Sequence, residues 1–207
     1  MTGMAEAAQK SSTRRFSFAE YVERELRSDF KSEYHGGEIL AMSGGTIDHS
    51  RIIRNLARRL SERLQGKPCE PFESNLRTYV REFDRAFYPD AQVICGPVEY
   101  HDADRNRTTV VNPTVLFEVL SPSTSSYDRG EKMRAYLSLP SLKQYVLIES
   151  TTAYVELLTR RDDGWLRTDA KGMESSLRID SIAIELKLAE LYLGVTFPPP
   201  AEMPERS

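Results

Sequence analysis

The sequence contains few cysteines, few histidines and no long apolar run. Its 207 residues include two cysteines, Cys69 and Cys95, which do not form a CxxC pair, and three histidines. We therefore expect neither a disulfide nor a structural zinc site, and interpret both cysteines as buried or half-buried thiols. Because no stretch of about 18 apolar residues occurs, we expect no membrane-spanning helix. Residues 1–15 lack the apolar core of a secretory signal, which favours a cytoplasmic protein in a reducing compartment.

A strong excess of one charge is also missing. Lys and Arg number 28 and Asp and Glu number 31, which gives a net charge of −3. A protein that coats nucleic acid or an anionic membrane needs a positive field, so this balance argues against both. It still allows a local basic groove or an enzyme that contacts nucleic acid briefly. We expect one domain over 16–195, between a disordered segment 1–15 and a disordered, proline-rich tail 196–207.

Two helices are predicted in the first third of the chain. Ser17-Phe18-Ala19-Glu20 has the pattern of a capping box, which predicts a helix to about Arg27. From Thr46 to Gln65 an apolar residue recurs every fourth position, and Gly66 follows as a stop signal. The opposite face of this second helix is rich in arginine. We interpret it as a solvated face, with a phosphate-binding strip as the alternative. These arginines are Arg51, Arg54, Arg58, Arg59 and Arg63.

Extended segments are interspersed with the helices. Gly36-Gly37 predicts a hairpin between Lys31–His35 and Glu38–Met42. Pro113–Leu120 is a nearly continuous apolar run, which is typical of a central strand buried on both faces. Together the elements predict an α/β or mixed α+β fold, with a central mixed sheet flanked by helices and a C-terminal β-hairpin. The remaining predicted elements are strands between Cys69 and Cys95 with a turn at 82–85, a loop over 97–112, a helix capped by Asp128 that ends near Leu139, strands at 145–149 and 153–159, a hairpin turn at 162–164 and a short helix near 184–192.

Two acidic residues occupy positions where burial would be costly. Asp90 opens an apolar strand, and Glu118 interrupts the run Pro113–Leu120. A buried carboxylate needs a partner, and a divalent cation held by two carboxylates is one solution. The alternative is that Asp90 makes a turn hydrogen bond and Glu118 pairs with an Arg or Lys. If a cation bridges them, the two residues should lie on adjacent strands with carboxylate oxygens within about 6 Å, and mutual repulsion should raise their pKa values.

A lysine and three histidines offer further chemistry. Lys132 follows the apolar strand closely enough to direct its ammonium at the two carboxylates, where it would steady a hydroxide or a phosphate oxygen. The alternative is a surface lysine four residues after Asp128. His49 could carry a proton, cap the helix start or contact a phosphate. We interpret His35 as a turn residue and His101 as a loop residue.

The order of these motifs resembles that of the PD-(D/E)xK nuclease superfamily and, more closely, its Uma-type restriction endonuclease family. The resemblance extends from about Phe16 to Leu193, and its specific part is E-V-L-S-P-S-T followed by D-R-G-E-K. The matching segments are Glu33–Met42, His49, Tyr88-Pro89-Asp90, Glu118–Thr124, Asp128–Lys132 with Tyr136, and Gln144–Ile148.

The resemblance implies a restriction endonuclease-like fold and roles for particular residues. Asp90 and Glu118, helped by the carbonyl of Val119, would hold Mg²⁺, with Mn²⁺ as a substitute. Glu33 would orient water or a second ion. The superfamily pattern places a lysine two residues after the glutamate, where this chain has Leu120. Lys132, from the next helix, is the candidate to replace it.

The function implied by the resemblance is metal-dependent hydrolysis of phosphodiester bonds, with DNA as the leading substrate. One alternative is a nuclease-fold protein that binds nucleic acid or a protein partner without cutting, and another is cleavage of RNA or of a branched structure. Cutting both strands of a duplex generally needs two sites related by a two-fold axis. We therefore expect a homodimer, formed through the hairpin Tyr154–Thr168 or the N-terminal helix.

Overall fold

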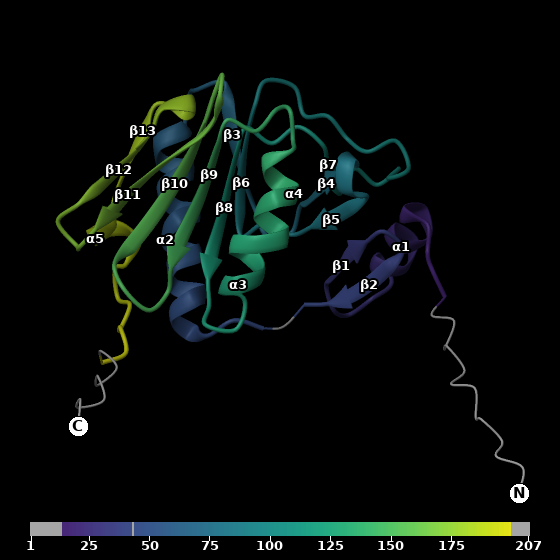
Figure 1. Ribbon diagram of the computed structural model, residues 1–207, viewed down its shortest axis with the longest axis horizontal. Coiled ribbons are helices and arrows are strands. Elements are labelled where there is room, and N and C mark those ends of the chain that lie inside the picture. Colours follow the sequence, from purple (N-terminus) through teal and green to yellow (C-terminus); the bar gives the residue numbers. More distant parts are fainter. Residues whose placement is uncertain (1–13, 43, 200–207) are drawn as a thin grey trace, which may run out of the picture.

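The computed structural model describes residues 14–42 and 44–199, and its framework consists of β-sheets with helices packed against them (Figure 1). The helices are α1 (Phe18–Glu25), α2 (Ile47–Leu64), α3 (Ser125–Tyr127), α4 (Met133–Leu137) and α5 (Leu188–Leu191). The strands are β1 (Ser32–His35), β2 (Glu38–Ala41), β3 (Cys69–Glu73), β4 (Arg77–Val80), β5 (Arg85–Phe87), β6 (Ala91–Cys95), β7 (Thr109–Val110), β8 (Val115–Leu120), β9 (Gln144–Glu149), β10 (Tyr154–Arg161), β11 (Gly164–Lys171), β12 (Ser176–Ile179) and β13 (Ile184–Lys187).

The strands divide between two mixed sheets and a separate hairpin. One sheet has the order β11-β10-β9-β8-β6-β3, and the other has the order β2-β1-β5-β4-β7. In the first, β8 and β9 are parallel, and in the second, β4 and β7 are parallel. Strands β12 and β13 form the hairpin. The mixed α+β class is therefore confirmed, and the strands expected in one central sheet divide between two large sheets.

Both N-terminal helices form as their sequence signals predict. The capping box of α1 is complete, because Ser17 and Glu20 each accept a hydrogen bond from the other's backbone N–H. Helix α2 begins after Thr46, whose side chain accepts from the backbone N–H of His49. Its apolar stripe, including Ile52 and Leu56, is buried against the six-stranded sheet. The arginines of its other face pair mostly with acidic neighbours, which agrees with a solvated face.

Strand β8 lies at the centre of the six-stranded sheet and is buried along its whole length. Its side chains alternate between two cores. Val115, Phe117 and Val119 face the core that contains α2, whereas Leu116 and Leu120 face the core that contains α4. Glu118, between them in the alternation, therefore points to the α4 side. This placement brings a carboxylate beneath the helix that carries Lys132.

The two cysteines correct the prediction of unpaired thiols, because Cys69 and Cys95 form a disulfide. Strands β3 and β6 are antiparallel, and their register places the two residues directly opposite each other. The neighbouring pair, Pro68 and Gly96, is hydrogen-bonded, so the cysteines occupy the closer, non-hydrogen-bonded type of pair. Sequence spacing alone did not reveal this register.

Two helix predictions also need correction. The helix after β8 begins at Ser125 rather than after Asp128, and a π-helical turn over Asp128–Lys132 joins α3 to α4. Asp128 is thus inside the helical segment and not its cap. Near the C-terminus, Ile184–Lys187 is a strand, and the helix is limited to Leu188–Leu191.

The predicted terminal disorder falls largely on residues 1–13 and 200–207, which lie outside the described residues. At 14–15 and 196–199 the structure gives individual contacts, and the disorder itself stays a prediction. Arg15 donates a hydrogen bond to the carbonyl of Gly36, and the ring of Phe197 packs at 5.3 Å from that of Tyr192. Over the described ranges, every helix is too short or too polar to cross a membrane.

Candidate active site

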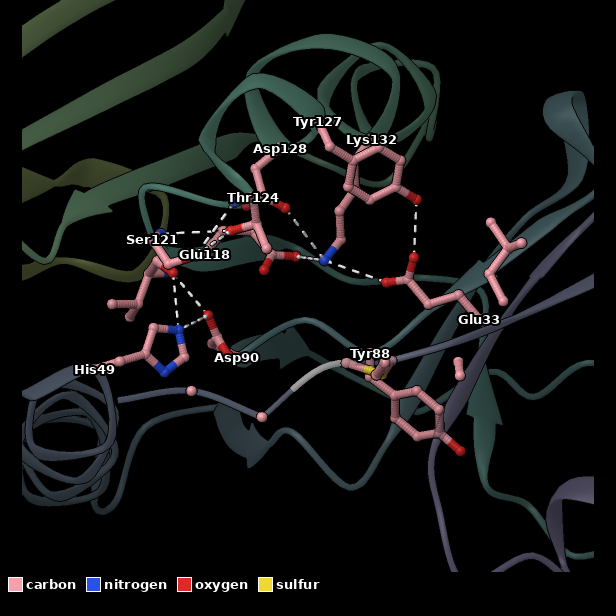
Figure 2. Close-up of a pocket in the computed structure, with 16 residues that line it drawn as sticks. Glu33, His49, Tyr88, Asp90, Glu118, Ser121, Thr124, Tyr127, Asp128 and Lys132 are labelled. Carbon is pink, nitrogen blue, oxygen red and sulfur yellow. Dashed lines mark hydrogen bonds and ion pairs between the residues drawn. The ribbon is translucent and has the colours of Figure 1, made fainter. Parts of the chain in front are cut away.

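A pocket of about 350 Å³ collects all the predicted site residues (Figure 2). It lies between the two large sheets and the helical segment that follows β8. Glu33 comes from β1, Asp90 from the residue before β6, Glu118 and Val119 from β8, and Lys132 from the π-helical turn. Residues from four separate stretches of the chain thus face one space.

Asp90 and Glu118 enter the pocket from adjacent strands. Strands β6 and β8 are antiparallel with Ala91 opposite Phe117, and one further step in this register places Asp90 opposite Glu118. Asp90 is held there by its Oδ2, which accepts the backbone N–H of Val119 at 2.7 Å. Burial raises the pKa of both carboxyls, most strongly that of Glu118. The predicted direction is right, but the main cause is loss of solvent and not mutual repulsion.

Lys132 is a buried centre of ion pairs, and the alternative of a surface lysine is wrong. Its Nζ lies 2.8 Å from Glu118 Oε1, 3.4 Å from Glu33 Oε1 and 3.7 Å from Asp128 Oδ1, and only 4% of the residue is exposed. Burial alone would lower the pKa of Lys132, but the three carboxylates outweigh it and raise that pKa. The three carboxylates therefore favour the charged ammonium.

Glu33 divides its two oxygens between different partners. Oε1 faces Lys132, whereas Oε2 accepts the hydroxyl of Tyr127 at 2.8 Å and lies 3.4 Å from His35 Nε2. Burial would raise the pKa of Glu33, but His35, Lys132 and Tyr127 together lower it. Sequence reasoning missed His35 and Tyr127. Since Glu33 and His35 are two residues apart on one strand, their shared face was the available signal.

His49 contacts the group that was predicted to be a metal ligand. Its Nε2 lies 2.9 Å from the carbonyl oxygen of Val119 and 3.7 Å from Asp90 Oδ2. The ring packs tightly over Gly45, where an added Cβ would lie 2.6 Å from Nδ1. The first turn of α2 therefore links β8 and the start of β6. Its helix cap is Thr46, not the histidine side chain.

The pocket has a large excess of negative groups. Four carboxylates, Glu33, Asp90, Glu118 and Asp128, line it together with one ammonium, and no arginine lines it in the described part of the chain. In those same ranges, no three His, Cys, Asp or Glu side chains form a ready metal cluster. Mg²⁺ needs fewer protein ligands than such a cluster supplies, since it keeps several waters and commonly binds through one or two carboxylates.

The donor set of Asp90, Glu118 and the Val119 carbonyl fits such a hydrated ion. The described residues donate to Oδ2 of Asp90 and Oε1 of Glu118, but to neither Oδ1 nor Oε2. The Val119 carbonyl retains a second lone pair beside its bond to His49. Each group thus keeps an oxygen lone pair with which to bind a cation.

Comparisons with known proteins agree with the fold and the motifs. A solved structure, described as a putative nuclease belonging to DUF820 from Anabaena variabilis, superposes with a TM-score of 0.66 at 17% identity, over 83% of this chain and 96% of that one. The chain thus has the fold of that structure, a restriction endonuclease-like fold. Residues 18–190 match the Uma2 family model, described as "Putative restriction endonuclease". The chain belongs to the Uma2 family.

Two relatives from Synechocystis sp. extend the match over most of the chain. "Uncharacterized protein slr1290" is 36% identical over 180 residues, which is 86% of this chain and 92% of the relative. "Uncharacterized protein sll1609" is 31% identical over 175 residues, which is 84% of this chain and 98% of the relative.

Proposed function

We propose that this protein is a metal-dependent endonuclease that hydrolyses phosphodiester bonds in DNA. The observation that carries the proposal is the grouping of Asp90 and Glu118, opposed on adjacent strands, with Lys132 in one carboxylate-rich pocket. The pocket has more carboxyl groups than cationic side chains, so an added cation would offset the repulsion of a phosphate diester. The family description and the nuclease described for the structural neighbour support the same reaction.

Asp90, Glu118 and the Val119 carbonyl are the groups that would hold Mg²⁺, with Mn²⁺ as a substitute. Such a metal, when bound, makes a water more acidic and takes up negative charge on the phosphate oxygens. Asp90 is fixed by the backbone N–H of Val119, so its free oxygen is presented in one orientation. His49 fixes the Val119 carbonyl in the same way.

Lys132 and Glu33 would act on the water and the phosphate. Because the neighbouring carboxylates raise the pKa of Lys132, its charged form is favoured and would offer a positive charge to an attacking water or to a phosphate oxygen. It contacts Glu118 from the next helix, although Leu120 occupies the superfamily's lysine position in the sequence. The lowered pKa of Glu33 keeps this carboxylate ionised and able to orient a water.

A binding protein without activity is the second candidate. The short pair between Lys132 and Glu118 favours it, because a closed ion pair satisfies both groups without a metal. In that case the ion pairs of the pocket would be structural, and replacing one of its carboxylates by an amide would destabilise the fold.

Cleavage assays with the purified protein separate these candidates. We expect cleavage of plasmid DNA with Mg²⁺ or Mn²⁺, none with EDTA, and none by Glu118→Gln. The matched control is Glu149→Gln, which removes a carboxylate paired with Arg129 outside the pocket and should retain activity. RNA and branched DNA tested in parallel define the substrate. Absence of metal-dependent cleavage on every substrate, or full activity of Glu118→Gln, would contradict the proposal.

A further inference from the structure

The side of the pocket away from Asp90 contains a compact polar cluster that the proposed reaction has not used. Tyr127, at the end of α3, and His35, at the end of β1, meet at Glu33. Tyr127 Oη lies 2.8 Å from Glu33 Oε2 and 3.0 Å from His35 Nε2. The two rings are stacked with centroids 6.0 Å apart, and Phe87 contacts the imidazole edge-on at 5.5 Å.

Proton counting fixes the direction of these hydrogen bonds. A tyrosine hydroxyl has one proton, and an ionised carboxylate can only accept. Tyr127 therefore donates to Glu33, and its oxygen accepts a hydrogen bond from the N–H at His35 Nε2. The imidazole thus carries its proton on Nε2. The same nitrogen lies 3.4 Å from Glu33 Oε2, so its N–H is also directed toward a hydrogen-bond acceptor there. His35, Tyr127 and Glu33 form a directed chain that ends on one carboxylate oxygen.

We propose that Tyr127 and His35 are positioning residues that hold Glu33 with its second oxygen turned toward Lys132 and the reacting phosphate. Oε2 is occupied by the hydroxyl of Tyr127, so Oε1 is the oxygen left to face the ammonium at 3.4 Å. The inference rests on the proposed nuclease function, in which Glu33 orients the attacking water. It adds two residues that contact Glu33 and that make no hydrogen bond to Asp90, Glu118 or the Val119 carbonyl in the described part of the chain.

The electrostatics of the cluster agree with this role. Burial raises the pKa of Tyr127 and the adjacent Glu33 raises it further, so the phenol stays a hydrogen-bond donor. Glu33 is the one pocket carboxyl whose pKa shift is downward among Glu33, Asp90, Glu118 and Asp128. The cluster therefore favours an ionised Glu33 beside three carboxyls for which ionisation is harder.

A double-mutant cycle on cleavage tests whether Tyr127 acts through Glu33. We expect Tyr127→Phe to lower kcat by about 10- to 100-fold, with KM for DNA and the Mg²⁺ dependence unchanged. In a Glu33→Gln background the same change should have almost no further effect, because the group it positions is gone. His35→Phe should resemble Tyr127→Phe, whereas His35→Gln, which keeps an N–H donor, should recover most of the rate. Additive losses in the cycle would overturn the proposal.

A second measurement does not depend on cleavage. NMR titration of the Glu33 carboxyl, which faces His35, Tyr127 and Lys132, should show a pKa that rises in Tyr127→Phe. The control Tyr79→Phe deletes a similar bond to a carboxylate, Asp84, at 2.7 Å and away from the pocket, and should leave both kcat and the titration unchanged. An unmoved titration in Tyr127→Phe would overturn the positioning role. An inert wild type would instead contradict the nuclease function, and the titration would still decide the role of Tyr127.

Discussion

Lys132 is the residue on which the charge balance of the pocket depends. It is the shared partner of Glu33, Glu118 and Asp128, and its ammonium is almost fully buried. Removing one member of a buried pair leaves the other charge without compensation, which is more costly than losing the attraction itself. The lysine thus stabilises the metal-free pocket as well as serving the proposed reaction.

Replacement of this lysine should therefore affect both stability and rate. Lys132→Met keeps the apolar stem and removes the charge. We expect a loss of about 3–5 kcal/mol in the free energy of unfolding in EDTA, and cleavage slower by about 100-fold or more. Chemical denaturation and initial rates measure the two effects. Lys143→Met, at an exposed position, is the control, and a stability change as small as that of this control would contradict the account.

Glu118 should make the metal-free protein less stable as pH rises. Its pKa is raised well above the ordinary value by burial, and the attraction of Lys132 offsets only part of this. Between the unfolded and folded pKa values the native state binds more protons, so this contribution is complete below the unfolded pKa and is lost as pH rises through the folded one. Glu118→Gln cannot titrate and should flatten the decline. Denaturation midpoints across a pH series in EDTA measure this, and parallel curves for the two proteins would refute it.

At the scale of elements, the π-helical turn over Asp128–Lys132 shapes the site. Side chains five residues apart approach the same face in such a turn, whereas α-helical geometry would separate them. Tyr127 and Lys132 are five residues apart, and both reach Glu33. The wide turn therefore lets one helical segment hold both oxygens of one carboxylate.

The junction between β2 and α2 offers a second test at this scale. Gly45→Ala would place a Cβ 2.6 Å from His49 Nδ1, whereas the same atom at Gly44 would meet no described residue within 4 Å. We expect Gly45→Ala to displace the imidazole from the Val119 carbonyl and to weaken Mg²⁺ binding about 10-fold or more, on the scale of losing a group that orients a ligand. Gly44→Ala should match the wild type. Calorimetric titration with Mg²⁺ measures the difference, and equal affinities in both variants would count against His49.

Elements with strong local signals were predictable from the sequence. The capping box at Ser17 and the four-residue apolar repeat of α2 are defined by residues close together in the sequence. The structure has both of the helices that they predict. The disulfide between Cys69 and Cys95 depends on strand register, which local patterns do not encode. Likewise, the local pattern predicted a standard helix capped by Asp128, where the structure has a π-helical turn.

The site was predictable where one residue was out of character for its surroundings. Asp90 and Glu118 beside apolar strand residues were such anomalies, and Lys132 was a candidate from its spacing after the apolar strand. Tyr127 and His35 are ordinary for their positions, and the packing of α3 near the end of β1 brings them together. Contacts between distant elements therefore account for what the sequence did not disclose.

For the whole molecule, two exposed surfaces are candidates for the interface of the expected homodimer, one at a sheet edge and one beside α1. Strand β11, within the predicted hairpin, is an edge of the six-stranded sheet and exposes Leu166, and Leu26 and Phe30 are exposed beside α1. We expect a dimer by light scattering over a wide concentration range. Leu166→Lys should dissociate it if β11 forms the interface, and Leu26→Lys should dissociate it if the surface beside α1 does. A strict monomer would argue against cutting of both strands, and nicking of one strand would remain the expected activity.

The linkage between Mg²⁺ and the stability of Asp90→Asn tests the central claim most directly. Asparagine keeps an acceptor for the Val119 N–H but removes the carboxylate, whose pKa is raised by burial. In EDTA we expect the variant to melt at the same temperature as the wild type or slightly higher. Mg²⁺ at 100 times its dissociation constant should stabilise the wild type by about 2.7 kcal/mol and leave the variant almost unchanged. A markedly lower melting temperature for the variant in EDTA, with no effect of Mg²⁺ on the wild type, would contradict a metal-dependent nuclease site.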